Sequence, residues 1–160
     1  MPTTPLIDFD TLDLTQTVGT PEDLKKYLKQ RGTFELLDGV LHQGPEDELT
    51  VGFKDIRADD WWAPDHIPGR PLFPGALMIE TAAQLASYDY LRYRGDLAED
   101  QFVGFGGLEK TRFRAAVTPG CRMVFAARLI RSRRSMFVYE CQAFVDQKIV
   151  FECEVMGVVV

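Results

Sequence analysis

Two residues near the middle of the chain could perform acid–base chemistry. His66 lies in a stretch rich in Pro and Gly, and Glu80 follows fourteen residues later within the apolar run "ALMIETAAQLASY". An imidazole titrates near neutral pH and is the commonest general base. Burial among apolar side chains raises the pKa of a carboxyl group, which then holds a proton to donate. Taken singly, each residue is better explained structurally: His66 by a bond to loop backbone, Glu80 by a polar contact across an interface.

The segment between the two residues favours the catalytic interpretation. Three prolines within residues 68–74 fix backbone φ angles, so the loop would hold His66 with little freedom. Gly75 stands where a helix begins, and the free backbone N–H groups there could bind a carbonyl oxygen that gains negative charge. A base, an acid and oxyanion donors together indicate removal of a proton next to a carbonyl, coupled to loss or gain of water at the β-carbon.

These groups need a long helix and a sheet to position them. A helix is expected over residues 76–94, where Glu80 and Gln84 share one face, and it is apolar on nearly every side. Such a helix must be covered all round, by a curved sheet and with the help of a second subunit. The prediction is an α+β domain in which an antiparallel sheet wraps the helix. Strands are expected at residues 33–43, 48–56, 102–110, 121–132, 134–145 and 149–159.

The chain before the first strand has its own pattern. Residues 1–19 indicate an irregular arm, and residues 20–31 indicate a short amphipathic helix with Thr20 as its N-cap. Residues 57–75 are expected to form a loop, and residues 20–160 a single domain.

The last two strands allow a prediction of register. Their apolar faces coincide if Val145 lies opposite Ile149, which leaves a three-residue turn with Gln147 in the left-handed region. In that register Cys141 lies across from Cys153, and both are expected to be free thiols facing the core.

Composition excludes several classes of protein. A chain of 160 residues suits one domain with a substantial core. It has no apolar run long enough to span a membrane, and its first residues do not resemble a secretory signal. Three cysteines without metal-ligand spacing indicate a reduced, cytoplasmic protein with no metal site. A net charge of −6 argues against general nucleic-acid binding.

The segment "HIPGRPLFPGALMIETAAQ" resembles the active-site segment of the FabZ-type (3R)-3-hydroxyacyl-acyl-carrier-protein dehydratases, H-F-P-x-x-P-x-x-P-G-V-L-x-x-E-x-x-A-Q. "FELLDGVL" and "FGGLEKTRFRAAVTPG" resemble flanking strands of that family, so the resemblance covers roughly residues 34–158. Asp65 stands in place of the usual Gly and Ile67 in place of the usual Phe, but no catalytic group is missing.

The resemblance implies a hot-dog fold, a homodimer or trimer of dimers, and no cofactor. It implies that His66 is the base, that Glu80 of the partner chain is the acid, and that the Gly75 amide binds the thioester oxygen. Ile67 and Gln84 would line the substrate site. The implied reaction is dehydration of (3R)-3-hydroxyacyl chains on acyl carrier protein to trans-2-enoyl thioesters, in fatty-acid or related lipid biosynthesis. Glu80, where isomerising relatives carry Asp, points to dehydration alone.

An acidic carrier protein would need a local basic patch on this acidic chain. The candidates are Lys110, Arg112, Arg114, Arg131, Arg133 and Arg134. A solvated face explains these arginines equally well.

Three other functions remain open. An acyl-CoA thioesterase would not need the histidine. An (R)-specific enoyl-CoA hydratase has its acid before its histidine. A non-catalytic acyl-binding protein usually lacks one of the pair.

Overall fold

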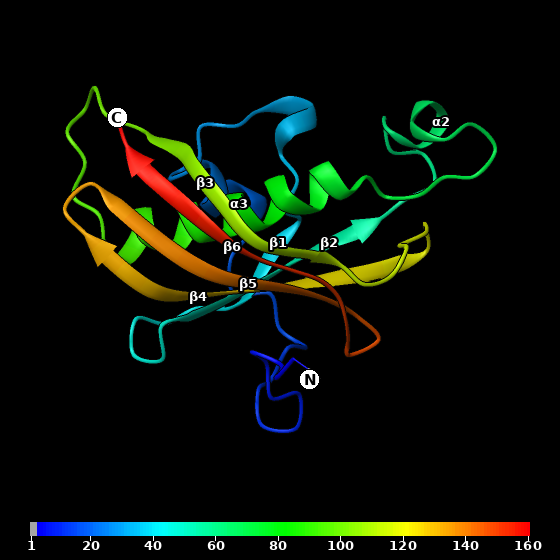
Figure 1. The fold of residues 1–160 in the computed structure, drawn as a ribbon, viewed down its shortest axis with the longest axis horizontal. Helices are drawn as coiled ribbons and strands as arrows, with labels where there is room; N and C mark the ends of the chain where they lie inside the picture. The colour runs from blue at the N-terminus through cyan, green and yellow to red at the C-terminus, as the bar shows by residue number, and fades with distance from the viewer. Residues whose placement is uncertain (1–2) are drawn as a thin grey trace.

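One long helix, α3 (Gly75–Tyr93), lies against a six-stranded antiparallel sheet in the computed structural model, which describes residues 3–160 (Figure 1). The strands lie in the order β1-β2-β4-β5-β6-β3. Their bounds are β1 Gly39–His42, β2 Leu49–Ile56, β3 Val103–Phe113, β4 Cys121–Arg133, β5 Met136–Val145 and β6 Lys148–Val159. The α+β class expected from the sequence is confirmed. Among the described residues, no helix is long and apolar enough to cross a membrane.

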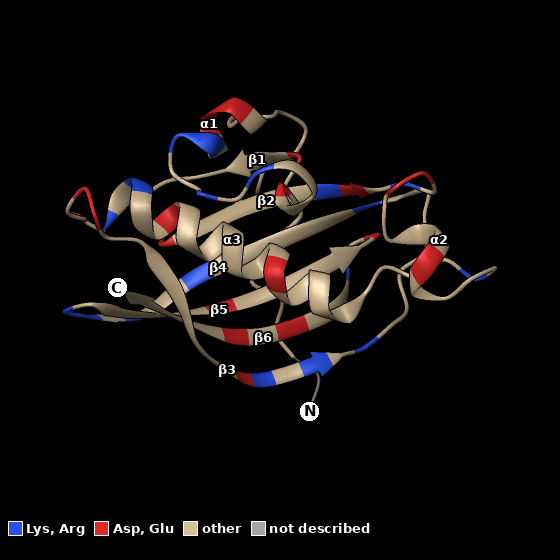
Figure 2. Cartoon of the chain, turned by 90° about the horizontal axis from the view of Figure 1, so that it is seen from above, with Lys and Arg blue, Asp and Glu red and all other residues tan. Residues whose placement is uncertain are grey.

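Helix α3 is buried along most of its length, as its apolar composition predicts. Its buried residues run from Met78 to Tyr90 and pack mainly against β4, β5 and β6 (Figure 2). Large side chains on the inner face of the sheet, such as Phe125 and Phe151, are fully buried beneath it. Removal of this apolar surface from water is the main stabilising contribution to the fold.

Close approach between β5 and β6 requires a glycine at position 157. A Cβ atom there would lie 2.1 Å from the ring of Phe137. That ring stacks on Tyr90 of α3, with 4.0 Å between ring centroids. The missing side chain thus makes room for an aromatic contact between helix and sheet.

The β5–β6 pairing confirms one part of the predicted register. Cys141 lies opposite Cys153, and both are buried free thiols. Phe137, Tyr139 and Ala143 point into the same core cluster as Cys141.

The turn between these strands differs from the prediction. It has two residues, Asp146 and Gln147, at φ of 49° and 65°. Gln147 is left-handed as expected, but the three-residue turn and the Val145–Ile149 pair are wrong, because Val145 lies opposite Lys148. A two-residue turn with both residues left-handed matches strand twist best. A register shift next to Phe144 then restores the inward alternation.

The helix predicted over residues 20–31 is shorter than expected. Helix α1 spans Pro21–Lys25 and starts at a capping box in which Thr20 and Asp23 bond each other's backbone. After it, the chain turns instead of continuing as a helix. The Arg31 guanidinium donates to the carbonyls of Lys25, Leu28 and Gln30 at 3.1, 2.8 and 2.7 Å. These bonds satisfy carbonyls that a longer helix would have used.

The strand predicted over residues 33–43 begins only at Gly39. A short 3₁₀ helix, Gly32–Phe34, comes first, and the backbone of Phe34 and Leu36 bonds the Gln84 side chain instead of a strand. The predicted loop 57–75 contains a further short helix, α2 (Ala63–His66). Side-chain partners on α3 therefore decide where the first strand starts.

The N-terminal arm packs against the face of the sheet opposite α3. Residues 1 and 2 of the predicted arm lie outside the described residues, and the rest is irregular. Leu6 and Ile7 are buried in a second apolar cluster that includes Phe144. The Leu6 N–H donates to Gln142 Oε1 at 2.7 Å, and Gln142 Nε2 donates to the Thr4 carbonyl at 3.0 Å. The arm thus covers apolar side chains on the outer face.

A buried polar cluster centred on Asp89 joins α3 to the sheet. Asp89 has no exposed surface and accepts hydrogen bonds from Thr50 Oγ1 at 2.6 Å, from Arg94 Nε at 3.0 Å and from the Tyr139 hydroxyl. Burial, and after it the Asp89 carboxylate, raises the pKa of Tyr139. Sequence reasoning missed this cluster, although Asp89 follows directly on the apolar helix segment.

Candidate active site

His66 is the last residue of α2 and is exposed. Its Nδ1 lies 2.8 Å from the carbonyl oxygen of Leu72. A carbonyl can only accept a hydrogen bond, so Nδ1 carries a hydrogen, and in the neutral imidazole Nε2 is then the nitrogen with the lone pair. The Pro/Gly segment that follows His66 thus supplies the group that orients the imidazole, and Nε2 is available as a base.

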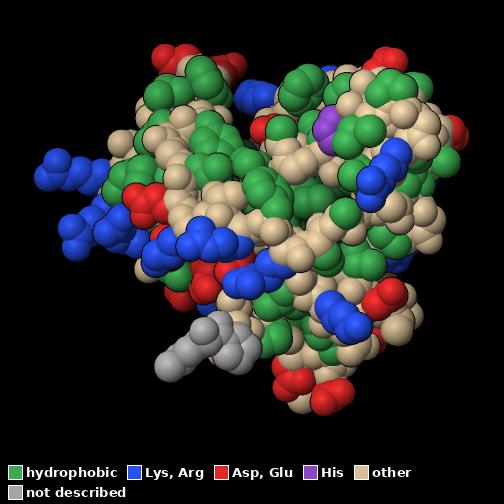
Figure 3. Space-filling model, turned by 45° about the vertical axis from the view of Figure 1, so that its right-hand side comes forward, with side chains coloured by type: hydrophobic (Ala, Val, Ile, Leu, Met, Phe, Trp, Pro, Cys, Tyr) green, Lys and Arg blue, Asp and Glu red, His purple; other side chains and the backbone are tan. Residues whose placement is uncertain are grey.

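His66 opens onto a hollow of about 550 Å³ that also contains the start of α3. It is lined by His66, Leu72, Phe73, Gly75, Met78, Phe113, Arg114, Ala115 and Ala116. A Cβ atom at Gly75 would lie 2.8 Å from the Phe113 ring, so a larger residue at this first helical position would have to displace that ring. The positive end of the helix dipole therefore faces the hollow that contains the His66 imidazole. On this side of the molecule, hydrophobic side chains gather and basic side chains border them (Figure 3).

Glu80 lies on α3 in a second, smaller hollow of about 110 Å³. Besides Glu80, the hollow is lined by Gln30, Ala83, Gln84 and Ser87, by residues 103–105 of β3 and by residues 155–157 of β6. Glu80 is half-buried, and its Oε1 accepts a hydrogen bond from Gln84 Nε2 at 3.0 Å. One carboxylate oxygen is thus held, and the other is available for a substrate group.

Gln84 is itself anchored by the protein. It is buried, its Nε2 donates to the Phe34 carbonyl at 2.8 Å, and its Oε1 accepts from the Leu36 N–H at 3.4 Å. Both ends of the amide are occupied by protein groups. The geometry therefore makes Gln84 an orienting group for Glu80, where the sequence suggested contact with substrate.

The described residues place His66 and Glu80 in separate hollows. Gly75 shares a hollow with His66, whereas Gln84 shares one with Glu80. Ile67, the remaining residue expected to contact substrate, is 39% exposed and lines neither of these hollows. A single chain thus presents the His66 imidazole beside the N-terminus of α3 at one place and the Glu80 carboxyl group at another.

The expected basic patch divides into two groups. Arg114 lines the His66 hollow and donates to Glu152 at 2.7 Å, while Lys110 pairs with Glu154 at 2.6 Å. Arg112 is exposed between them on β3. The second group, Arg133 and Arg134, is exposed around the turn that joins β4 to β5, and Arg131 lies between the two groups because it shares a hollow with Lys110 and Glu154. Acidic neighbours thus neutralise much of the first group, and the second is the stronger candidate for long-range attraction.

The edge strand β3 exposes several large apolar side chains. Phe105, Leu108 and Phe113 are 51%, 38% and 54% exposed, and Phe102 just before the strand is 51% exposed. This strand also borders both hollows, through Phe105 at Glu80 and through Phe113 at His66. An exposed apolar edge is a ready surface for pairing with another chain.

A known protein family and several known proteins match most of this chain in sequence. The FabA-like domain family matches residues 28–154. A 3-hydroxyacyl-[acyl-carrier-protein] dehydratase FabZ from Syntrophotalea carbinolica is 35% identical over 136 residues, which is 85% of this chain and 91% of that protein. A protein of the same name from Desulfotalea psychrophila is 30% identical over 130 residues, covering 81% and 86% of the two chains.

Solved structures show the same fold. The dehydratase heterocomplex ApeI:P from Xenorhabdus doucetiae matches with a TM-score of 0.70 at 17% identity, covering 84% of this chain and 89% of that one. A mutant thioesterase from Pseudomonas aeruginosa matches with a TM-score of 0.62 at 18% identity, covering 92% and 99%. The long helix against an antiparallel sheet is thus the hot-dog arrangement, shared by enzymes of more than one activity.

Proposed function

Because the chain belongs to the FabA-like family, we propose that it is a hydro-lyase that dehydrates (3R)-3-hydroxyacyl chains carried on acyl carrier protein. The product is the trans-2-enoyl thioester, and the reaction needs no cofactor. The observation that carries this proposal is the free Nε2 of His66, which shares a hollow with the N-terminus of α3. The relatives named as FabZ dehydratases support the choice of carrier-bound substrate.

The proposed mechanism uses three groups, Gly75 and His66 of one chain and Glu80 of its partner. The thioester oxygen accepts a hydrogen bond from the Gly75 N–H, where the helix dipole stabilises developing negative charge. His66 Nε2 removes the proton from the α-carbon. Glu80 in its protonated form gives its proton to the β-hydroxyl, the C–O bond breaks, and water leaves as the double bond forms. The Gln84 bond to Glu80 Oε1 leaves Oε2 to carry that proton.

We propose that two subunits combine to make each site. His66 and Glu80 lie in different hollows of one chain, and β3 offers an apolar edge beside both. Antiparallel pairing of β3 with its copy about a two-fold axis would bring the base of one chain to the acid of the other. A homodimer is the smallest such assembly, and a trimer of dimers contains the same pair. Three free cysteines suit a reducing compartment such as the cytoplasm.

The test is an assay of enoyl thioester formation from a 3-hydroxyacyl carrier-protein thioester. His66→Ala and Glu80→Gln should each lower kcat by roughly 10²–10⁴-fold, as expected for a general base or acid. His42→Ala is the matched control, because that histidine bonds Asp47 at 2.8 Å, away from both hollows. Full activity in either single variant would remove that residue from the mechanism. Release of free thiol in place of enoyl product would indicate a thioesterase.

Mixing the two inactive variants tests the shared site. Random exchange makes half of the dimers mixed, and each mixed dimer has one intact site of two, so about one quarter of wild-type activity should return. Absence of recovery, when subunit exchange is demonstrated independently, would mean that both groups act within one chain.

A further inference from the structure

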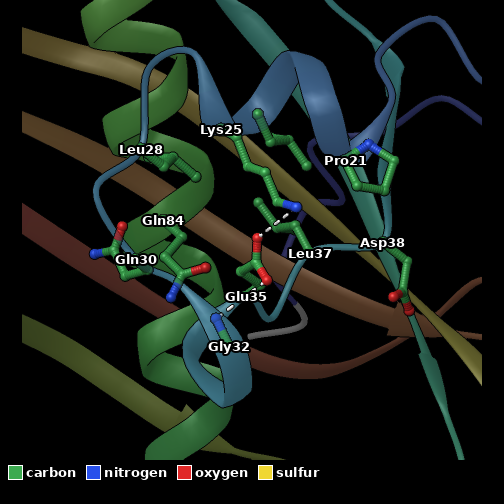
Figure 4. A pocket seen from close by; sticks show the side chains of 10 residues that line it. Pro21, Lys25, Leu28, Gln30, Gly32, Glu35, Leu37, Asp38 and Gln84 are labelled. Atoms are coloured by element: carbon green, nitrogen blue, oxygen red, sulfur yellow. Dashed lines mark hydrogen bonds and ion pairs between the residues drawn. The ribbon is translucent and has the colours of Figure 1, made fainter.

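A third hollow, shown in Figure 4, shares lining residues with the one that holds Glu80. It has a volume of about 240 Å³ and lies between α3 and the segment of residues 21–38. Its lining is Pro21, Leu24, Lys25, Leu28, Gln30, Gly32, Glu35, Leu37, Asp38 and Gln84. The catalytic groups proposed above do not use it.

The floor of this hollow is apolar and its charged groups are paired. Leu24, Leu28 and Leu37 are buried beneath it. Lys25 Nζ lies 3.2 Å from Glu35 Oε1, and the Gly32 N–H donates to the other Glu35 oxygen at 3.1 Å (Figure 4). A ligand there would contact leucine side chains, and its binding would not remove an unpaired charge from water. These conditions suit an alkyl chain.

Two side chains, Gln30 and Gln84, line both this hollow and the Glu80 hollow. They therefore form the partition between the two. Gln84 is fixed by its bonds to Phe34, Leu36 and Glu80. The Gln30 side chain makes no hydrogen bond within residues 3–160, so it can turn aside at little cost.

The roof over the hollow is held in place without a ligand. Arg31 binds three backbone carbonyls of residues 25–30, and the capping box at Thr20 fixes the start of α1. A preformed hollow loses little conformational entropy when it is filled.

We propose that this hollow receives the far end of a long acyl chain whose thioester end reacts at His66 and Glu80, and that Gln30 determines whether the chain can enter. This inference rests on the proposed dehydratase function. Gln84 lies four residues beyond Glu80, about 6 Å along the helix axis, so a chain that continues past the acid reaches the partition. A short chain ends before it.

The experiment compares Gln30→Trp with wild type on 3-hydroxybutyryl and 3-hydroxydodecanoyl carrier-protein thioesters. The indole should fill the passage. Each buried methylene is worth roughly fourfold in binding, so loss of two or three predicts a drop of about 15- to 60-fold in kcat/KM for the long substrate. The short substrate should lose much less than the long one, and a urea denaturation midpoint equal to that of wild type would show that the variant folds. Gln30→Ala should preserve or improve turnover of the long substrate.

Lys29→Trp is the matched control, because Lys29 is exposed, neighbours Gln30 and lines none of these three hollows. It should leave both substrates unchanged. Equal losses on short and long substrates in Gln30→Trp, or no loss on either, would overturn the chain-end site while leaving the dehydratase proposal standing. Failure of the wild-type protein to dehydrate the short substrate would instead overturn the proposed function itself.

Discussion

Replacement of Asp89 by Asn should destabilise the protein strongly, although it alters a single atom of the side chain. The carboxylate has no exposed surface and accepts bonds from Thr50, Arg94 and Tyr139. The Asn side chain keeps one oxygen that can accept a hydrogen bond. Its NH₂ group would replace the other oxygen and would face side chains that donate hydrogen bonds there. The Arg94 side chain is only 14% exposed, and its guanidinium, which cannot accept a hydrogen bond, would lose its countercharge.

The loss of stability can be estimated from the Arg94 charge that the substitution leaves buried without its partner. Breaking a buried ion pair by removing one partner costs about 3–5 kcal/mol, and the partial exposure of Arg94 favours the lower end. Domains of this kind are stable by about 5–15 kcal/mol, so the loss is a large fraction of the total. With about 2.1 cal/mol/K of unfolding entropy per residue over 160 residues, a loss of about 3 kcal/mol lowers Tm by about 9 °C.

Urea denaturation and thermal melting at one fixed protein concentration would measure this change, since association also affects apparent stability. Asp96→Asn is the control, because Asp96 is exposed after the end of α3 and should change stability by less than about 0.5 kcal/mol. If Asp89→Asn also stays within about 0.5 kcal/mol of wild type, the carboxylate does not have the role that its three partners suggest.

Three further predictions concern packing, pH and carrier binding. Gly157→Ala should cost about 1–3 kcal/mol in urea denaturation, because the new methyl group would overlap the Phe137 ring; an unchanged midpoint would contradict that contact. The raised pKa of Tyr139 in the folded state means that only the unfolded chain loses this proton just above pH ~10, so stability should fall there by up to about 1.4 kcal/mol per pH unit more in wild type than in Tyr139→Phe. Parallel pH profiles for the two proteins would count against this. Reversal of Arg133 and Arg134 to Glu should lower kcat/KM on a carrier-bound substrate and weaken its salt dependence, with little effect on kcat or on a short thioester lacking the carrier. Equal losses on both substrates would assign these arginines to the fold.

The elements that periodicity and composition define were predictable from the sequence. The long helix was found because a run apolar on all sides can only be a buried element, and β5 and β6 because their side chains alternate. The pairing of Cys141 with Cys153 followed from matching two apolar faces. The turn beside it was predicted wrongly, since an apolar pattern does not reveal a bulge that adds one residue to a strand.

Long-range side-chain contacts explain the other differences. Helix α1 ends early because Arg31 folds back onto the carbonyl of its last residue, Lys25, and β1 starts late because Gln84 takes the backbone groups of Phe34 and Leu36. The motif indicated His66, Gly75 and Glu80 as candidates, but spacing alone could not show that one chain separates the base from the acid. The role of Asp89 depends on partners 39 and 50 residues away, which no local pattern signals.

The strand order of the sheet also has a consequence for how the chain folds. Strands β4, β5 and β6 form a meander joined by short turns, so their pairing closes small loops and can form early. Strand β3 precedes them in the chain but pairs with β6, for example Val103 with Val159, across more than fifty residues. It must therefore wait until the meander exists. During that interval Phe105 and Leu108 have no neighbouring strand beside them, and newly made chains are most prone to aggregate at this stage.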